Sequence, residues 1–60
     1  MALSKYDKSL LATVALRDDV KAEFKPLFEH CLNLAADAHR RGNFKRAGMD
    51  LAHARKVARY

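Results

Sequence analysis

The chain has 60 residues, of which half are hydrophobic, and it carries a formal net charge of +5. A chain of this length forms one small domain, residues 1–60, and its single cysteine, Cys31, excludes the internal disulfides of small secreted scaffolds. No apolar run approaches the ~18 residues of a membrane span, and the N-terminus lacks a signal peptide. We therefore expect a complete cytoplasmic protein with no membrane partner.

Alanine is abundant, whereas glycine occurs twice and proline once. Alanine has the best helix propensity, and the sequence contains no β-branched run of strand length. These features predict an all-α fold, which we expect to be a compact three-helix bundle built on an antiparallel helical hairpin.

The first helix is predicted over residues 5–17. Ser4 and Asp7 have the spacing of a capping box, and an acid near the start of a helix also interacts favourably with the helix dipole. Five apolar residues then recur at helical spacing and are expected to face the core: Leu3, Tyr6, Leu10, Leu11 and Val14.

The second helix is predicted over residues 19–40, with Pro26 as an internal kink. Asp18 and Asp19 favour this start because aspartate is a good N-cap. In the alternative, the first helix continues to about Glu23, and Pro26 occupies the first turn of the second helix, where proline is best tolerated.

The second helix has the widest apolar arc, so we expect it to be central, with neighbours on two sides. The arc comprises Val20, Phe24, Leu27, Phe28, Cys31, Leu34, Ala35 and Ala38, with Leu32 at its margin. Two arginines followed by Gly42 predict the end of this helix, because glycine readily takes the left-handed conformation of a helix C-cap.

The third helix is predicted over residues 44–59, with Asn43 as its N-cap. Its inner face is expected to hold Phe44, Ala47, Leu51, Ala54 and Ala58. The small alanine side chains on this face allow a close approach to the second helix.

Small and apolar residues follow a regular pattern along this hairpin: Cys31, Leu34, Ala35 and Ala38 on one helix, Gly42 and Phe44 at the turn, and Ala47, Leu51 and Ala54 on the other. With these spacings, residues 28–58 resemble a single tetratricopeptide (TPR) repeat. Cys31, Ala38 and Leu51 stand where the family usually has aromatic residues, and the closing proline is missing. The resemblance implies a peptide- or protein-binding scaffold without catalysis.

No pattern in the sequence predicts catalysis, a metal or a cofactor. His30, His39 and His53 lack the spacing and the accompanying ligands of a zinc site. His30 and Cys31 are adjacent, so they diverge by ~100° around a helix and cannot form a nucleophile–base pair. The chain also lacks a glycine-rich phosphate loop. We therefore expect that the protein is not an enzyme.

Positive charge is concentrated at the C-terminal end of the sequence. Residues 39–60 carry seven lysines and arginines against one acid, Asp50, whereas residues 1–38 have a net charge of −1. Such asymmetry indicates an acidic partner. The predicted partner-binding residues are Arg40, Arg41, Lys45, Arg46, His53, Lys56 and Arg59, with Met49 and Tyr60 as apolar anchors.

The leading hypothesis is a small interaction protein, of the kind found among phage- and plasmid-borne regulators and inhibitors, that binds an acidic surface of a larger protein. The alternative is a nucleic-acid-binding protein whose same cations contact phosphates. Base reading is not expected, because the third helix has no Asn, Gln, Ser or Thr after Asn43. So small a core also makes a homodimer a candidate state.

Overall fold

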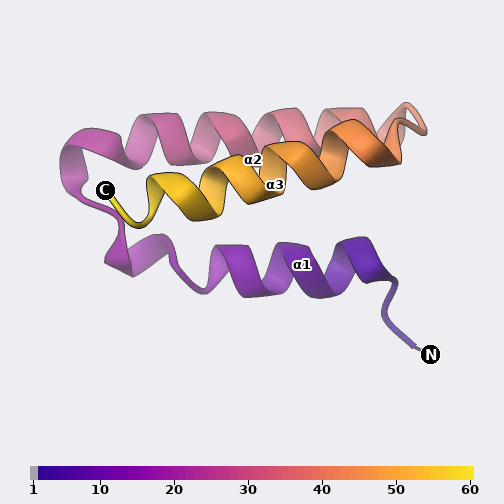
Figure 1. Cartoon of the computed structure of the whole chain (residues 1–60), viewed down its shortest axis with the longest axis horizontal. Helices are drawn as coiled ribbons and strands as arrows, with labels where there is room; N and C mark the ends of the chain where they lie inside the picture. Colours follow the sequence, from indigo (N-terminus) through magenta and orange to yellow (C-terminus); the bar gives the residue numbers. More distant parts are fainter. Residues whose placement is uncertain (1) are drawn as a thin grey trace.

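The computed structural model describes residues 2–60 and contains three α-helices: α1 (Lys5–Val14), α2 (Lys25–Arg40) and α3 (Phe44–Val57). Two short 3-10 helices, Arg17–Asp19 and Ala22–Phe24, connect α1 to α2. The described residues include no strand, and the helices pack side by side (Figure 1). The predicted all-α bundle is therefore confirmed.

The start of α1 follows the predicted capping box. The Asp7 backbone N–H donates to Ser4 Oγ at 3.1 Å, and the Ser4 N–H donates to Asp7 Oδ2 at 3.3 Å. The end of α1 differs from the prediction, because the helix stops at Val14 rather than at Arg17. The prediction is therefore correct for the start of α1, which local hydrogen bonds define, and wrong for its end.

The buried face of α1 is rotated relative to the predicted stripe. Leu3, Leu11 and Val14 are exposed, whereas Thr13 is fully buried. The Thr13 hydroxyl is satisfied there: it donates to the Ser9 carbonyl at 2.7 Å and accepts from Arg55 Nη1 at 3.3 Å. Burial of this polar side chain is tolerated because its hydroxyl has a hydrogen-bond partner both as a donor and as an acceptor.

Pro26 is not a kink, and the predicted helix over residues 19–40 is wrong in its first part. α2 begins at Lys25, so Pro26 lies in the first turn, where a backbone N–H would have no acceptor within the helix. The alternative placed Pro26 correctly but extended the first helix to Glu23, which is also wrong. Val20 and Lys21 have extended backbones that separate the two 3-10 helices, and Val20 is buried.

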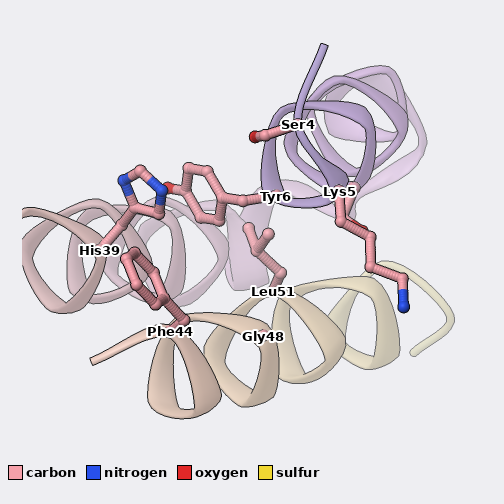
Figure 2. Close-up of a pocket in the computed structure, with 8 residues that line it drawn as sticks. Ser4, Lys5, Tyr6, His39, Phe44, Gly48 and Leu51 are labelled. Carbon is pink, nitrogen blue, oxygen red and sulfur yellow. The ribbon is translucent and has the colours of Figure 1, made fainter. Parts of the chain in front are cut away.

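α3, not α2, is the central helix. It packs along α2 and also against α1, and Figure 1 shows it between them. The side chains that α3 buries are mostly small, which allows close approach on both sides: Ala47, Asp50, Leu51, Ala54 and Val57. Contact between α1 and α2 includes the stack of Tyr6 on His39 (Figure 2).

The apolar arc of α2 is only partly covered, because it has a neighbour mainly on one side. Leu27 and Leu34 are each 39% exposed, whereas Leu32, predicted at the margin, is buried. Phe44 of α3, predicted on the inner face, is 66% exposed. The main buried cluster consists of Val20, Phe28, Cys31, Leu32, Ala35, Leu51, Ala54 and Val57.

The turn between α2 and α3 has the predicted glycine geometry. Gly42 has φ +79°, its N–H donates to the His39 carbonyl at 3.0 Å, and the Asn43 N–H donates to the Ala38 carbonyl at 2.9 Å. These two bonds form a Schellman motif. Asn43 then caps α3 by accepting from the Arg46 N–H at 3.3 Å, as predicted.

Gly42→Ala is expected to lower the free energy of unfolding by about 1–2 kcal/mol, because the left-handed conformation brings a Cβ against the following carbonyl. A clash with neighbouring side chains does not contribute to this loss, since an added Cβ would meet nothing within 4 Å. Urea unfolding followed by circular dichroism measures the change. Gly48→Ala is the control: Gly48 lies inside α3 with open space around it, so alanine should stabilise the helix by about 1 kcal/mol. If both variants changed the free energy of unfolding in the same direction, the left-handed conformation assigned to Gly42 would be contradicted.

Candidate functional site

The outer face of α3 brings together four of the predicted partner-binding residues. Arg46, Met49, His53 and Lys56 line a shallow depression of about 410 Å³, together with Asp50 and Ala52. Met49 is 58% exposed, which is high for a large apolar side chain. The depression therefore combines a largely exposed apolar side chain, Met49, with two cations, Arg46 and Lys56, and one acid, Asp50.

Lys45 and Arg59 extend this surface toward the two ends of α3. Lys45 lies one turn before Met49, so both side chains project from the same side of the helix. Arg59 follows the last turn of α3, and Lys45, Lys56 and Arg59 are all exposed. No ion pair joins these three cations to an acid within residues 2–60.

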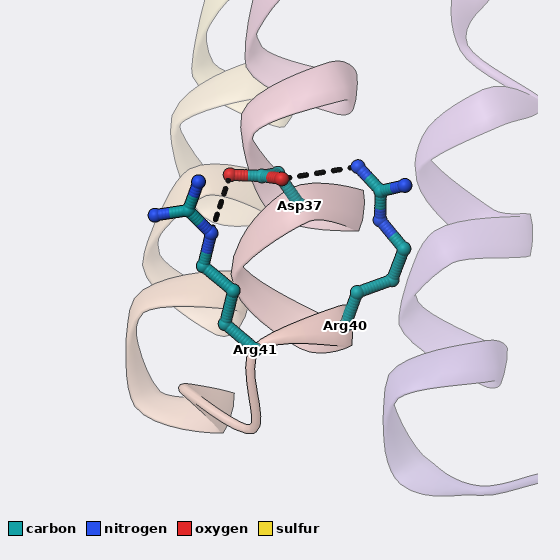
Figure 3. Close-up of polar contacts among 3 residues, drawn as sticks. All are labelled: Asp37, Arg40 and Arg41. Atoms are coloured by element: carbon teal, nitrogen blue, oxygen red, sulfur yellow. Dashed lines mark hydrogen bonds and ion pairs between the residues drawn. The ribbon is translucent and has the colours of Figure 1, made fainter.

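Arg40 and Arg41 lie at the end of α2, and both form ion pairs with the same acid, Asp37. Arg40 Nη2 lies 3.0 Å from Asp37 Oδ1, and Arg41 Nε lies 3.2 Å from Asp37 Oδ2. Figure 3 shows the two guanidinium groups on opposite sides of this carboxylate. Asp37 therefore neutralises part of the charge that the two exposed arginines carry at the turn.

Asp50 is a residue of this surface that the sequence analysis did not select. It is buried, its Oδ1 lies 3.6 Å from Arg46 Nε, and the two residues are four positions apart on α3. That spacing is the signal from which the pair could have been predicted. Burial and, to a smaller extent, the charge of Asp50 raise the pKa of the Cys31 thiol, which disfavours the reactive thiolate.

Tyr60 does not line the depression; its ring packs against Phe24 instead. Its ring meets Phe24 edge to face, with centroids 5.5 Å apart and an interplanar angle of 71°. Phe24 itself packs against the buried cluster. Tyr60 therefore covers one end of the core, although it is still partly exposed.

The described residues, 2–60, contain no group of three or more His, Cys, Asp or Glu side chains placed to hold a metal ion. In the same residues, no helix has the length and apolar character needed to cross a membrane.

Comparison with known proteins found no match among protein-family models, curated proteins or solved structures. The relationship of residues 28–58 to TPR repeats therefore stays a prediction. Of the residues that define the pattern, Cys31, Ala35 and Leu51 are buried, whereas Leu34 and Phe44 are exposed.

Proposed function

We propose that this chain is a non-enzymatic interaction protein that binds and modulates a larger protein. The binding surface would be the outer face of α3, from Lys45 to Arg59, with Met49 at its centre. The observation that carries the proposal is the depression in which exposed Met49 lies among Arg46, His53 and Lys56. Methionine is flexible and polarisable, so it suits an anchor that adapts to a partner surface.

The charges of this face favour a partner surface that is acidic at its rim and apolar at its centre. Lys45, Lys56 and Arg59 are exposed on long side chains, and no ion pair within residues 2–60 engages them. Carboxylates on a partner would complement them and accelerate association, while burial of Met49 would supply affinity.

Nucleic-acid binding is the second candidate, supported by the cluster of cations at the turn. A protein partner is the better candidate because of Met49. This apolar side chain is 58% exposed within the depression, and an apolar protein surface could bury it, whereas a phosphate backbone offers nothing apolar to cover it. The carboxylates of Asp37 and Asp50, which lie beside three of the arginines, weaken the attraction of those cations for either kind of acidic partner.

The double variant Met49→Asp/Lys56→Glu is expected to reduce partner binding at least about tenfold, because it places a carboxylate where the proposal needs an apolar anchor, and an anchor of the hot-spot kind contributes about 2 kcal/mol or more. The tagged protein is incubated with nuclease-treated lysate, and captured proteins are quantified by mass spectrometry. Leu11→Asp/Lys8→Glu on α1 is the matched control: Leu11 is also 58% exposed, and the net charge changes equally. Both variants should fold, because all four side chains are exposed.

Two results would count against the proposal. One is equal retention of the captured proteins by both double variants, which would place binding elsewhere. The other is submicromolar binding of labelled DNA or RNA with a steep dependence on salt, which would favour phosphate contacts instead.

A further inference from the structure

A second hollow, of about 470 Å³, lies between the first turns of α1 and the first turns of α3. Figure 2 shows Tyr6 and Lys5 projecting from α1 in different directions, Tyr6 toward His39 and Lys5 away from the rings on the far side of Leu51, while Phe44 and Gly48 lie on α3. Its volume is within the ~300–1,000 Å³ typical of small-molecule sites. It lies on a different side of α3 from Met49, because adjacent helical residues diverge by ~100°.

Aromatic rings form one wall of this hollow. Tyr6 stacks on His39 with ring centroids 3.9 Å apart and an interplanar angle of 14°, and His39 lies 5.2 Å from Phe44. Phe44 is 66% exposed, so much of its apolar surface has no cover. Rings held in this way offer flat apolar surfaces against which another planar group can stack.

Gly48 contributes no side chain to the hollow, so the space next to its backbone is unfilled. It lies inside α3, where glycine is disfavoured, and an added Cβ would meet nothing within 4 Å. Packing between helices therefore does not require glycine at this position. A side chain here would project into the hollow, beside Leu51, and reduce its volume.

The polar residues that line the hollow carry one formal charge. Lys5 is the one lysine, arginine or acid among them. The hydroxyls of Ser9 and Tyr6 also line it, and desolvation and then Asp7 raise the pKa of Tyr6, so its O–H stays a donor. The Ser4 hydroxyl already accepts from the Asp7 N–H, which leaves its own hydrogen to donate.

We propose that this hollow binds a small planar aromatic anion, such as a one- or two-ring carboxylate. The exposed Phe44 ring and the face of Tyr6 that is turned away from His39 would cover its flat faces, and Lys5 would pair with its negative charge. This site is independent of the surface proposed for a protein partner, because the depression around Met49 shares none of its lining residues.

The test uses 2-naphthoate as the probe, titrated into the ¹⁵N-labelled protein and followed by NMR. Binding is expected with a Kd on the order of 1 mM, a reasonable affinity for a ligand of this size. The shifted amides should be those of the hollow, around Tyr6, His39 and Gly48. The neutral analogue 2-naphthalenemethanol should bind about threefold more weakly, since a pair with an exposed lysine contributes little.

Two variants separate the contributions of shape and charge. Gly48→Leu should weaken 2-naphthoate binding at least about tenfold by filling the hollow, while keeping the helix, because leucine has a higher helix propensity than glycine. Lys5→Gln should make the acid and the neutral analogue bind equally. Ala36→Leu, at an exposed position of α2, is the matched control and should bind like the wild type.

Three results would overturn the proposal: no shifts with 2-naphthoate up to its solubility limit, equal binding of the two probes to the wild type, or unchanged binding by Gly48→Leu. Should Gly48→Leu lose its helical circular dichroism, Gly48→Ala gives the same test with a smaller expected loss, about threefold. Its single added methyl group points into open space.

Discussion

Replacing Phe28 with alanine is expected to lower the free energy of unfolding by about 3–5 kcal/mol. The Phe28 side chain has no exposed surface, and it belongs to the buried cluster with Leu51 and Val57. Truncating a buried phenylalanine costs about 3–5 kcal/mol, from lost burial and from the cavity left behind. A domain of this length has a total stability of only roughly 3–9 kcal/mol. One substitution therefore removes much or all of the free energy of unfolding.

Far-UV circular dichroism during urea unfolding measures this loss. Leu34→Ala is the matched control, because Leu34 lies on the same helix but is 39% exposed. We expect it to lower the free energy of unfolding by about 1 kcal/mol or less. Equal losses from the two variants would mean that α2 turns a different face to the core.

The second large effect is expected from Ala54→Leu, which should destabilise the protein by about 1–3 kcal/mol through overpacking. Ala54 has no exposed surface and lies in the buried cluster, where α3 meets α2. A leucine side chain has three more carbon atoms than alanine, and a close-packed interface can hold them only if the helices move apart. Burial of the added carbons offsets only part of that cost.

Thermal unfolding compares Ala54→Leu with Ala52→Leu, two positions earlier on α3. Ala52 is exposed, so leucine there should change the free energy of unfolding by no more than about 0.5 kcal/mol. A stabilising effect of Ala54→Leu would show that α2 and α3 are not closely packed at this position.

The helix starts at Ser4 and Asn43 and the turn at Gly42 were predicted from the sequence, and the structure confirms them. Each depends on hydrogen bonds between residues at most five positions apart, so a short stretch of sequence holds all the information. Residues 15–17 and 19–24 were predicted as parts of two long helices, and this prediction is wrong: two short 3-10 helices lie between α1 and α2. Val20, between these two turns, is buried in the core, and such a contact does not show in short-range sequence patterns.

The candidate binding residues were predicted as one basic face, whereas in the structure they lie at three separate places. Met49 and its neighbours on α3 form the depression, as their helical spacing indicated. The arginines at the turn share Asp37, and Tyr60 covers Phe24. The hollow beside Gly48 could not be predicted, because it forms only where the start of α1 lies beside the end of α2 and the start of α3, which are distant from α1 in sequence.

The sequence by itself determined that three helices form, together with the caps at Ser4 and Asn43 and the turn at Gly42, since those features depend on near neighbours along the chain. The tertiary structure decided which face of each helix is buried: Thr13 rather than Leu11, and Leu32 rather than Leu34. It also decided that α3 is central. The physical reason is that periodicity identifies a helix as amphipathic, whereas the direction of its buried face depends on which other helices cover it.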